Sequence, residues 1–255
     1  MFGFLSDLPL MLLALPAILI SLSVHEASHG YAAYKLGDNT AYNMGRLTLN
    51  PLKHINLFGF LSMLFFNVGW ANPVPVNSRF FKNPRRDMAI TAAAGPVSNL
   101  CLSLIFTILL RLVLIPIKAI ADGALTISGS YYYMDESLAE NPVFTILSLL
   151  AIVLYLGISL NLNLMFFNLI PLPPLDGSRI AYIFLPSNLY FKIMRYERYI
   201  MIAFIVLLAS GIVSLPLGVL TGGMMDFFYN ITGMPEDLLA VVISNIVSRL
   251  PEFSL

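Results

Sequence analysis

Long runs of apolar residues, separated by polar connections, dominate this sequence. The first lies at about 8–36, and its part from Leu8 to Val24 contains no charged residue. Similar runs lie at about 87–117, 143–170 and 199–220. Since a helix needs about 20 mainly apolar residues to cross a bilayer, each of the four runs is long enough to do so. The pattern therefore predicts an all-α polytopic membrane protein with about four core transmembrane helices.

A shorter apolar segment follows the first predicted span. Its fourteen uncharged residues are too few to cross a bilayer, so we expect a re-entrant or β-hairpin-like region at 57–77. Near its end, Pro73 and Pro75 have no amide donor and fall on one side of an extended chain. Val74 and Val76 keep their donors on the other side. The segment is either an ordinary proline-rich loop or a strand that can pair along one edge.

The last part of the chain has a different pattern. A Pro-Glu-Asp sequence at 235–237 favours the start of a helix, and the polar residues that follow gather on one side. We therefore expect a C-terminal helix at 235–250 that lies at the membrane interface. Together with the spans and the re-entrant region, this helix makes 1–255 a single membrane-embedded domain.

The composition agrees with a membrane protein and narrows its chemistry. Of the 255 residues, 58% are hydrophobic and 11% are charged, whereas a soluble domain is typically about 25% charged. The formal net charge is zero, which gives no reason to expect nucleic acid as a partner. The single cysteine, Cys101, excludes an intramolecular disulfide bond and a zinc site built from cysteines.

Basic residues indicate which connections face the cytoplasm. Of the 14 lysines and arginines, seven lie from Lys35 to Arg86 and four lie from Arg179 to Arg198. Cytoplasmic connections are enriched in these residues. We therefore expect both connections to be cytoplasmic and the N- and C-termini to be outside, in the plasma membrane of a bacterial or archaeal cell.

The first apolar run contains, towards its end, a motif of residues that can bind a metal ion and take part in catalysis, His25-Glu26-x-x-His29. On a helix, residues four positions apart share a face, so His25 and His29 can bind one tetrahedral metal ion. Glu26 is rotated by about 100° from His25, close enough to hold a water at the metal without being a ligand. Ionisable residues inside a membrane are costly and usually functional, which favours this interpretation over a structural histidine pair. The motif indicates a zinc hydrolase inside a membrane.

A third ligand is expected from a distant part of the chain. The third span is followed by a proline-rich loop that contains Asp176, at or near membrane depth. Asp176 is either a third metal ligand or the N-cap of the helix that follows it. The distribution of basic residues puts this loop and the histidine motif on the same, cytoplasmic side, which agrees with a shared metal site near that side.

Five motifs in this order resemble the site-2 protease family of intramembrane zinc metalloproteases, and together they span most of the chain. They are His25-Glu26-x-x-His29, Leu49 to Ile55, Gly69 to Val76, Gly95-Pro96-x-x-Asn99, and Asn168-x-x-Pro171-x-x-Pro174-x-Asp176-Gly177. The resemblance implies that His25, His29 and Asp176 hold a zinc ion (Zn2+), with Glu26 as the general base. It also implies that Asn168 assists catalysis by contacting the substrate carbonyl or oxyanion.

The resemblance further implies the kind of substrate. Members of the family cut single-pass transmembrane proteins within or next to their spans, often to release regulatory domains. The segment that contains Asn72, Val74 and Val76 matches one thought to lie against an extended substrate. We expect a minimal core without the PDZ or CBS domains of some members. Asn56 and Ser178 depart from the aspartate and glycine that are frequent in the family, although neither is an implied ligand.

Two other functions stay open at this point. A metal-ion transporter needs ionisable residues along several spans, whereas here they gather at one end of the first and third spans. A non-catalytic metal-binding scaffold would not need an intact Glu26. A di-iron oxidase of the desaturase type is excluded, because three histidines are too few for its ligands. The third histidine, His54, is expected to be structural, and the sequence does not predict the oligomeric state.

Overall fold

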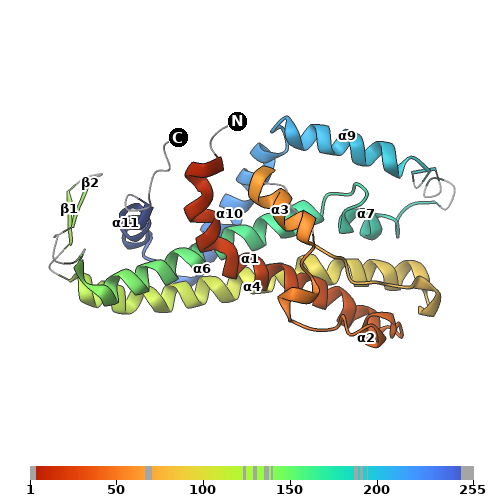
Figure 1. The fold of residues 1–255 in the computed structure, drawn as a ribbon, viewed down its shortest axis with the longest axis horizontal. Helices are drawn as coiled ribbons and strands as arrows, with labels where there is room; N and C mark the ends of the chain where they lie inside the picture. The colour runs from red at the N-terminus through yellow and green to blue at the C-terminus, as the bar shows by residue number, and fades with distance from the viewer. Residues whose placement is uncertain are drawn as a thin grey trace.

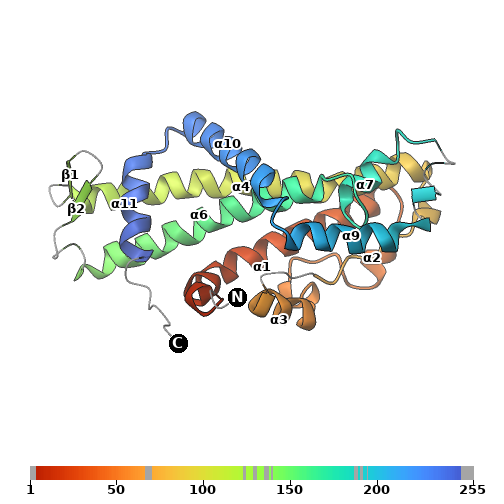
Figure 2. The ribbon, with the colours of Figure 1, turned by 90° about the horizontal axis from the view of Figure 1, so that it is seen from above.

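The computed structural model describes residues 4–66, 71–122, 125–128, 131–134, 138, 140–186, 189, 192–193 and 195–247. In this part of the chain, three helices are long and apolar enough to cross a membrane: α1 (Phe4–Lys35), α4 (Pro84–Ala121) and α6 (Pro142–Asn168). They coincide with the first three predicted spans, as expected of a multi-pass membrane protein. α4 and α6 run side by side along the longest axis, and α1 packs against both (Figures 1 and 2).

Local sequence signals set the ends of these helices. α1 stops at Lys35, and Gly37 follows with a φ of 106°, a left-handed conformation that favours glycine. α4 and α6 each have a proline in the first turn. Proline is tolerated there because a backbone N–H at this position would have no partner within the helix. Asn141 caps α6, because its side chain accepts from the amides of Val143 and Phe144.

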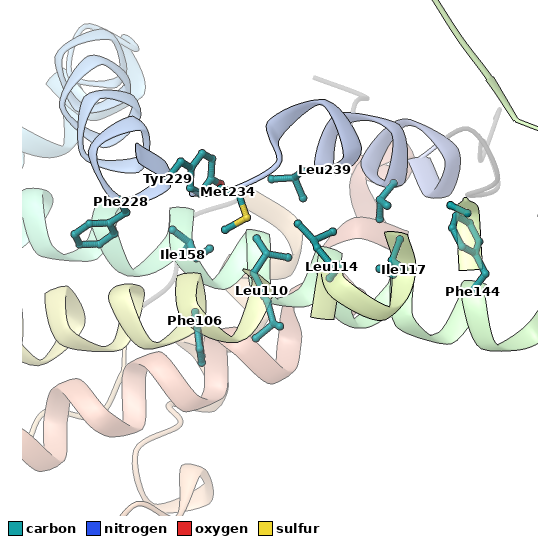
Figure 3. Packing of buried hydrophobic residues seen from close by; sticks show 14 of the residues in the cluster. Phe106, Leu110, Leu114, Ile117, Phe144, Ile158, Phe228, Tyr229, Met234 and Leu239 are labelled. Atoms are coloured by element: carbon teal, nitrogen blue, oxygen red, sulfur yellow. The ribbon is translucent and has the colours of Figure 1, made fainter. Parts of the chain in front are cut away.

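The core lies where α4 and α6 meet α10 (Ser214–Thr232) and α11 (Glu236–Val247). Its fully buried side chains include Leu110, Leu114, Ile117, Phe144 and Ile158 (Figure 3). Leu239 and Val242 of α11 are buried in the same cluster. The C-terminal helix expected at 235–250 is therefore present, and its apolar face packs on the bundle; residues 248–250 lie outside the described part.

The region expected to be re-entrant consists of a short helix and an extended return. α3 (Leu57–Phe66) begins after Asn56, whose side-chain oxygen accepts from the amide of Gly59. A β-bridge between Ile55 and Ala71 brings the two ends of the segment together, so the chain returns after α3 to the residues that precede this helix. Residues 67–70 of this region lie outside the described part of the chain. Residues 72–77, here called the extended segment, form neither a helix nor a regular strand, and Asn77 at their end has an extended backbone conformation.

The fourth predicted span, at 199–220, is not a single helix. The chain instead forms α9 (Glu197–Ala209) and α10, joined by a turn in which Gly211 has a φ of 75°. Glycine favours this conformation, which ends α9, and Pro216 then lies in the first turn of α10, where proline is tolerated. At about 1.5 Å per residue, α9 is roughly 20 Å long, shorter than the hydrocarbon core of about 30 Å.

Shorter elements complete the fold. The connection from α4 to α6 contains an antiparallel hairpin of β1 (Leu125–Ser128) and β2 (Tyr131–Met134), which the all-α prediction did not include. Between α1 and α4 lie α2 (Thr40–Asn43) and the 3₁₀ helices η1 (Pro51–Lys53) and η2 (Ser78–Phe80). The hairpin lies at one end of the molecule and α2 lies towards the other end (Figure 1).

Candidate active site

Three side chains from two distant parts of the sequence converge at the C-terminal half of α1. His25 and His29 lie one turn apart on α1, and Asp176 is the first residue of α7 (Asp176–Ala181). The Nε2 atoms of the two histidines are 3.1 Å apart. Asp176 Oδ2 lies 3.3 Å from Nε2 of His25 and 3.2 Å from Nε2 of His29. Among the described residues, these side chains form the group that could hold a metal ion.

The spacing of these three atoms fits a tetrahedral zinc ion. Zinc binds histidine nitrogen and carboxylate oxygen at about 2.0–2.1 Å, and two ligands of a tetrahedron are separated by about 1.6 times the bond length. The expected separation of about 3.3 Å is close to the distances of 3.1, 3.2 and 3.3 Å in the structure. Three protein ligands also leave a fourth position open, which is the pattern of catalytic zinc sites.

Hydrogen bonds to the two imidazoles determine which nitrogen faces the cluster. His25 Nδ1 lies 2.5 Å from Asn99 Oδ1, and His29 Nδ1 lies 2.7 Å from the carbonyl oxygen of Thr91. Since both partners are acceptors, each Nδ1 carries the ring proton, and each Nε2 has a free lone pair. Two lone pairs and a carboxylate oxygen that face one another repel unless a cation lies between them. The tautomers therefore agree with metal binding.

Asn99 connects His25 to a buried chain of hydrogen bonds that joins all three long helices. Asn99 Nδ2 donates to Asn161 Oδ1 on α6 at 2.7 Å. Asn161 Nδ2 donates in turn to Ser21 Oγ on α1 at 2.8 Å, and Ser21 Oγ donates to the carbonyl oxygen of Ala17. Asn99, Asn161 and Ser21 are fully buried. The ring orientation of His25 is thus fixed by the same contacts that hold the helices together.

Gly95 allows α4 to approach the imidazoles closely. A β-carbon at this position would overlap the rings of both His25 and His29. Gly95 lies four residues after Thr91 and four before Asn99, so all three share one face of α4. Glycine is required here because the backbone itself contacts the rings, and its missing side chain leaves the Thr91 carbonyl within reach of His29.

Asp176 is bound to the histidines and is not the cap of the helix that it begins. Leu175 occupies the N-cap position of α7. Asp176 Oδ2 instead faces the Nε2 atoms of both imidazoles, at 3.3 and 3.2 Å. A carboxylate in this position can supply the third, anionic ligand of a metal ion. Gly177 lets the loop fold tightly on the end of α6, because a β-carbon there would overlap backbone carbonyls.

Glu26 faces a cavity that it shares with the three-atom cluster. The cavity has a volume of about 190 Å³, room for several water molecules at about 30 Å³ each. Glu26 Oε2 accepts a hydrogen bond from the amide of Val74 at 2.8 Å. Glu26 is thus next to the cluster without belonging to it, which is the geometry expected of a residue that binds water at the metal.

Three further residues that the sequence singled out also line this cavity: Asn168, Val74 and Val76. Asn168 is the last residue of α6, and its Nδ2 donates to the carbonyl oxygen of Leu164 at 2.9 Å. The valines come from the extended segment after Ala71. Pro73 of the same segment lines the cavity as well, so this segment forms one wall of it.

Asn72 does not line the cavity and instead anchors the extended segment. Its amide donates to the carbonyl oxygen of His54, and its own carbonyl accepts from Arg46. Its side chain donates to the carbonyl oxygen of Ile55 and accepts from Asn56. These contacts fix the start of the extended segment, and the binding of substrate by Asn72 stays a prediction.

Sequence reasoning did not assign Asn99, Gly95 or Arg179 to the site. A usable signal existed for Asn99, because an amide in an apolar helix needs a partner, and Gly95 lies one turn before it. Arg179, three residues after Asp176, lines the cavity and is exposed. His54 is buried outside the cluster, with Nε2 2.8 Å from the carbonyl oxygen of Thr48, in agreement with a structural role.

Residues 13–210 of the chain match the family described as Peptidase family M50. This range includes both histidines, Glu26 and Asp176. No solved structure shows a significant match to the chain.

Individual relatives agree with this match. The chain is 40% identical over 193 residues to the "Putative zinc metalloprotease YwhC" of Bacillus subtilis, which covers 76% of this chain and 78% of that protein. It is 34% identical over 108 residues to the "Putative zinc metalloprotease Rip2" of Mycobacterium tuberculosis, over 40% of this chain and 41% of that protein. A protein of the same name from Mycolicibacterium smegmatis is 30% identical over 130 residues, over 49% and 50% of the two chains.

Proposed function

The chain belongs to peptidase family M50, the site-2 protease family of zinc metalloproteases, and we propose that it hydrolyses peptide bonds within or next to the transmembrane segments of single-pass membrane proteins. One observation supports this most strongly. His25, His29 and Asp176 converge beside Glu26 in a cavity among helices that are apolar enough to span a membrane. A protease site in that setting is suited to substrates that are themselves in the membrane.

We assign the metal to His25, His29 and Asp176, whose spacing and tautomers fit it. A zinc ion held there would act as a Lewis acid that lowers the pKa of a water and polarises a peptide carbonyl. Glu26 accepts the proton of the attacking water and returns it to the leaving amine as the peptide bond breaks. Its carboxylate has two oxygens, so it can receive a proton on one while the other keeps the bond to Val74.

Asn168 is proposed to contact the scissile carbonyl oxygen. It lines the cavity, and only one hydrogen of its amide is engaged by the Leu164 carbonyl in the described part of the chain. The second hydrogen can therefore donate to an oxygen that becomes negative as the carbonyl is attacked. Such a donor stabilises the transition state more than the ground state.

The substrate must be extended when it is cut, because a helix hides its carbonyls in internal hydrogen bonds. We propose that the segment of Val74 and Val76 binds this extended form as in β-strand addition, with the Val76 amide as a donor, because Glu26 already accepts from the Val74 amide. Both residues line the cavity, and Pro73 and Pro75 cannot donate on the opposite edge. Asn72 holds the start of this segment through its side-chain hydrogen bonds to Asn56 and Ile55, and we propose that it serves substrate binding in this way.

The orientation in the membrane is also a proposal. The loops at the site end of α1 and α6 contain most of the basic residues, which favours a cytoplasmic position for the site in the plasma membrane and termini on the outside. A metal-ion transporter is less well supported, because the described residues contain one metal-binding group rather than a series along the spans.

The test of this proposal is cleavage by the purified protein in lipid vesicles. The wild type should cut a single-pass transmembrane probe, and mass spectrometry should place the cut within or next to its span. Glu26→Gln should keep its zinc and lose activity by about two to four orders of magnitude. Glu140→Gln changes an exposed glutamate and should behave as the wild type. Full activity of Glu26→Gln, or cuts only in soluble regions, would contradict the proposal.

A further inference from the structure

Val74 lies across the face of α1 that contains Glu26 and Gly30. Its amide donates to Glu26 Oε2 at 2.8 Å. Its side chain packs on Gly30, where an added β-carbon would lie 3.1 Å from Val74 Cγ1. Because Glu26 and Gly30 are one helical turn apart, a single residue contacts both. Val74 is 7% exposed, so this contact is part of the packed interior.

Both ends of the extended segment are fixed to the rest of the chain. At its start, the amide of Asn72 donates to the His54 carbonyl at 2.7 Å. At its end, the amide of Asn77 donates to Asp38 Oδ2 at 2.6 Å, and Asp38 is fully buried. Asp38 follows α1 by only three residues. The Val74 amide is therefore held at a fixed position relative to the helix that presents Glu26.

The two valines of this edge differ in one respect. Both follow a proline and both line the cavity. The Val74 amide is already bonded to Glu26, whereas the amide of Val76 has no partner among the described residues. One N–H forms one strong hydrogen bond, so the Val74 donor is committed to the carboxylate and the Val76 donor is available.

We infer that the backbone amide of Val74 is a positioning group for Glu26, seated by the contact of Val74 with Gly30, and that the Val76 amide is the donor that pairs with an extended peptide substrate. The inference rests on the proposed function, in which Glu26 is the general base. By holding Oε2, the amide leaves Oε1 directed to the attacking water. A substrate strand paired at Val76 then ends beside this carboxylate, where its scissile bond is cut.

A matched pair of variants separates the two roles. Val74→Pro and Val76→Pro each remove one amide hydrogen in the same extended, proline-containing segment. Hydrogen bonds to charged groups are the stronger kind, so Val74→Pro should lower kcat by about tenfold or more with little change in KM. Val76→Pro should instead raise KM, with kcat close to that of the wild type. Unchanged kcat in Val74→Pro, or a rise in KM alone, would overturn the assignment.

A second set of variants keeps every amide in place. Gly30→Ala should push Val74 away by a few tenths of an ångström and lower kcat, while bound zinc stays at the wild-type level. Val74→Ala alone keeps the amide but loses the side-chain contact with Gly30, so it should lower kcat less than Val74→Pro does. The double variant Gly30→Ala/Val74→Ala removes the steric conflict and should recover kcat to the level of Val74→Ala. Failure of the double variant to recover would show that Gly30 acts in another way and would overturn the seating contact.

A measurement without substrate separates this inference from the proposed function. Site-resolved amide hydrogen exchange on the zinc-loaded protein should show a slow Val74 amide that exchanges faster in Glu26→Ala. The Asn77 amide, bonded to Asp38, should not change. If the wild type cleaves no probe but Val74 responds in this way, the proposed function fails and the Val74–Glu26 contact stands. If the protein is active and Val74 does not respond, the inference fails alone.

Discussion

The imidazole of His25 on α1 and the side-chain amide of Asn99 on α4 form one buried unit, with His25 Nδ1 2.5 Å from Asn99 Oδ1. This bond fixes the tautomer and the rotation of a proposed zinc ligand. It also joins two helices that the sequence separates by more than 70 residues. The orientation of the ligand therefore depends on how the helices pack.

Removal of the Asn99 amide should weaken metal binding. In Asn99→Leu, His25 loses the acceptor that holds its Nδ1 proton, so we expect the zinc affinity to fall by about 10- to 100-fold. Competition with a chromophoric chelator measures this affinity without any substrate. Asn163→Leu is the matched control, since Asn163 is an amide in an apolar helix that bonds to Ser159 and Thr221. Equal affinities for the wild type and Asn99→Leu would contradict the role of Asn99.

Asn161 should contribute to the stability of the helix bundle. Asn161→Leu leaves the Asn99 amide without its acceptor and Ser21 without its donor. Interhelical hydrogen bonds in membranes are worth about 0.6–1.7 kcal/mol each, and a buried unpaired group costs about 1–3 kcal/mol. We expect the free energy of unfolding to fall by about 1–3 kcal/mol in a denaturant titration in detergent.

The control for this prediction is Ser98→Ala. Among the described residues, the Ser98 hydroxyl bonds to the Gly95 carbonyl of its own helix and to no other group, so its loss should change stability by less than about 0.5 kcal/mol. If Asn161→Leu is as stable as this control, the polar chain does not hold the helices together.

Gly95→Ala should abolish metal binding by a steric route. A β-carbon at this position overlaps both imidazoles, so α4 must move away from α1. We expect little bound zinc by elemental analysis and a lower melting temperature. Gly222→Ala in α10 is the control, because a β-carbon there meets no atom within 4 Å, and alanine should stabilise that helix by up to about 1 kcal/mol. Stoichiometric zinc in Gly95→Ala would show that the close approach is not needed.

Asp176→Asn should lower the zinc content of the purified protein. The amide keeps the size of the carboxyl but is neutral, and an anionic oxygen is the better zinc ligand. Removal of zinc from the wild type by a chelator should abolish cleavage, and added zinc should restore it. Asp237→Asn changes an exposed carboxyl on α11 and should leave the zinc content unchanged. A normal zinc content in Asp176→Asn would remove Asp176 from the ligand set.

The parts of the site that follow from local rules were predictable from the sequence. His25 and His29 share a face because a helix repeats every 3.6 residues. The basic residues favoured a position for Asp176 on the same side of the membrane as the histidines, and the structure brings its carboxylate to both imidazoles. The motifs of the family supplied the expected roles of Glu26 and Asn168.

The remaining parts depend on packing that no local rule determines. The partner of Asn99 is set by the face of α4 that meets α1, and that face depends on the absence of a side chain at Gly95. The hydropathy of 199–220 fits one span, but Gly211 adopts a left-handed conformation and divides it. A strand with one pairing edge at Val74 and Val76 was one of two interpretations of the sequence, beside a proline-rich loop. The engagement of the Val74 amide by Glu26 required their positions in space.

The central claim is that two imidazoles and one carboxylate bind a single zinc ion, and X-ray absorption at the zinc edge of the purified protein tests it most directly. The account predicts one zinc per chain with two imidazole ligands and only nitrogen or oxygen neighbours, at about 2.0–2.1 Å. It also predicts that this spectrum is lost in Asp176→Asn. A sulfur neighbour at about 2.3 Å, which only Cys101 or a methionine could supply within the chain, or an unchanged spectrum in Asp176→Asn would contradict it.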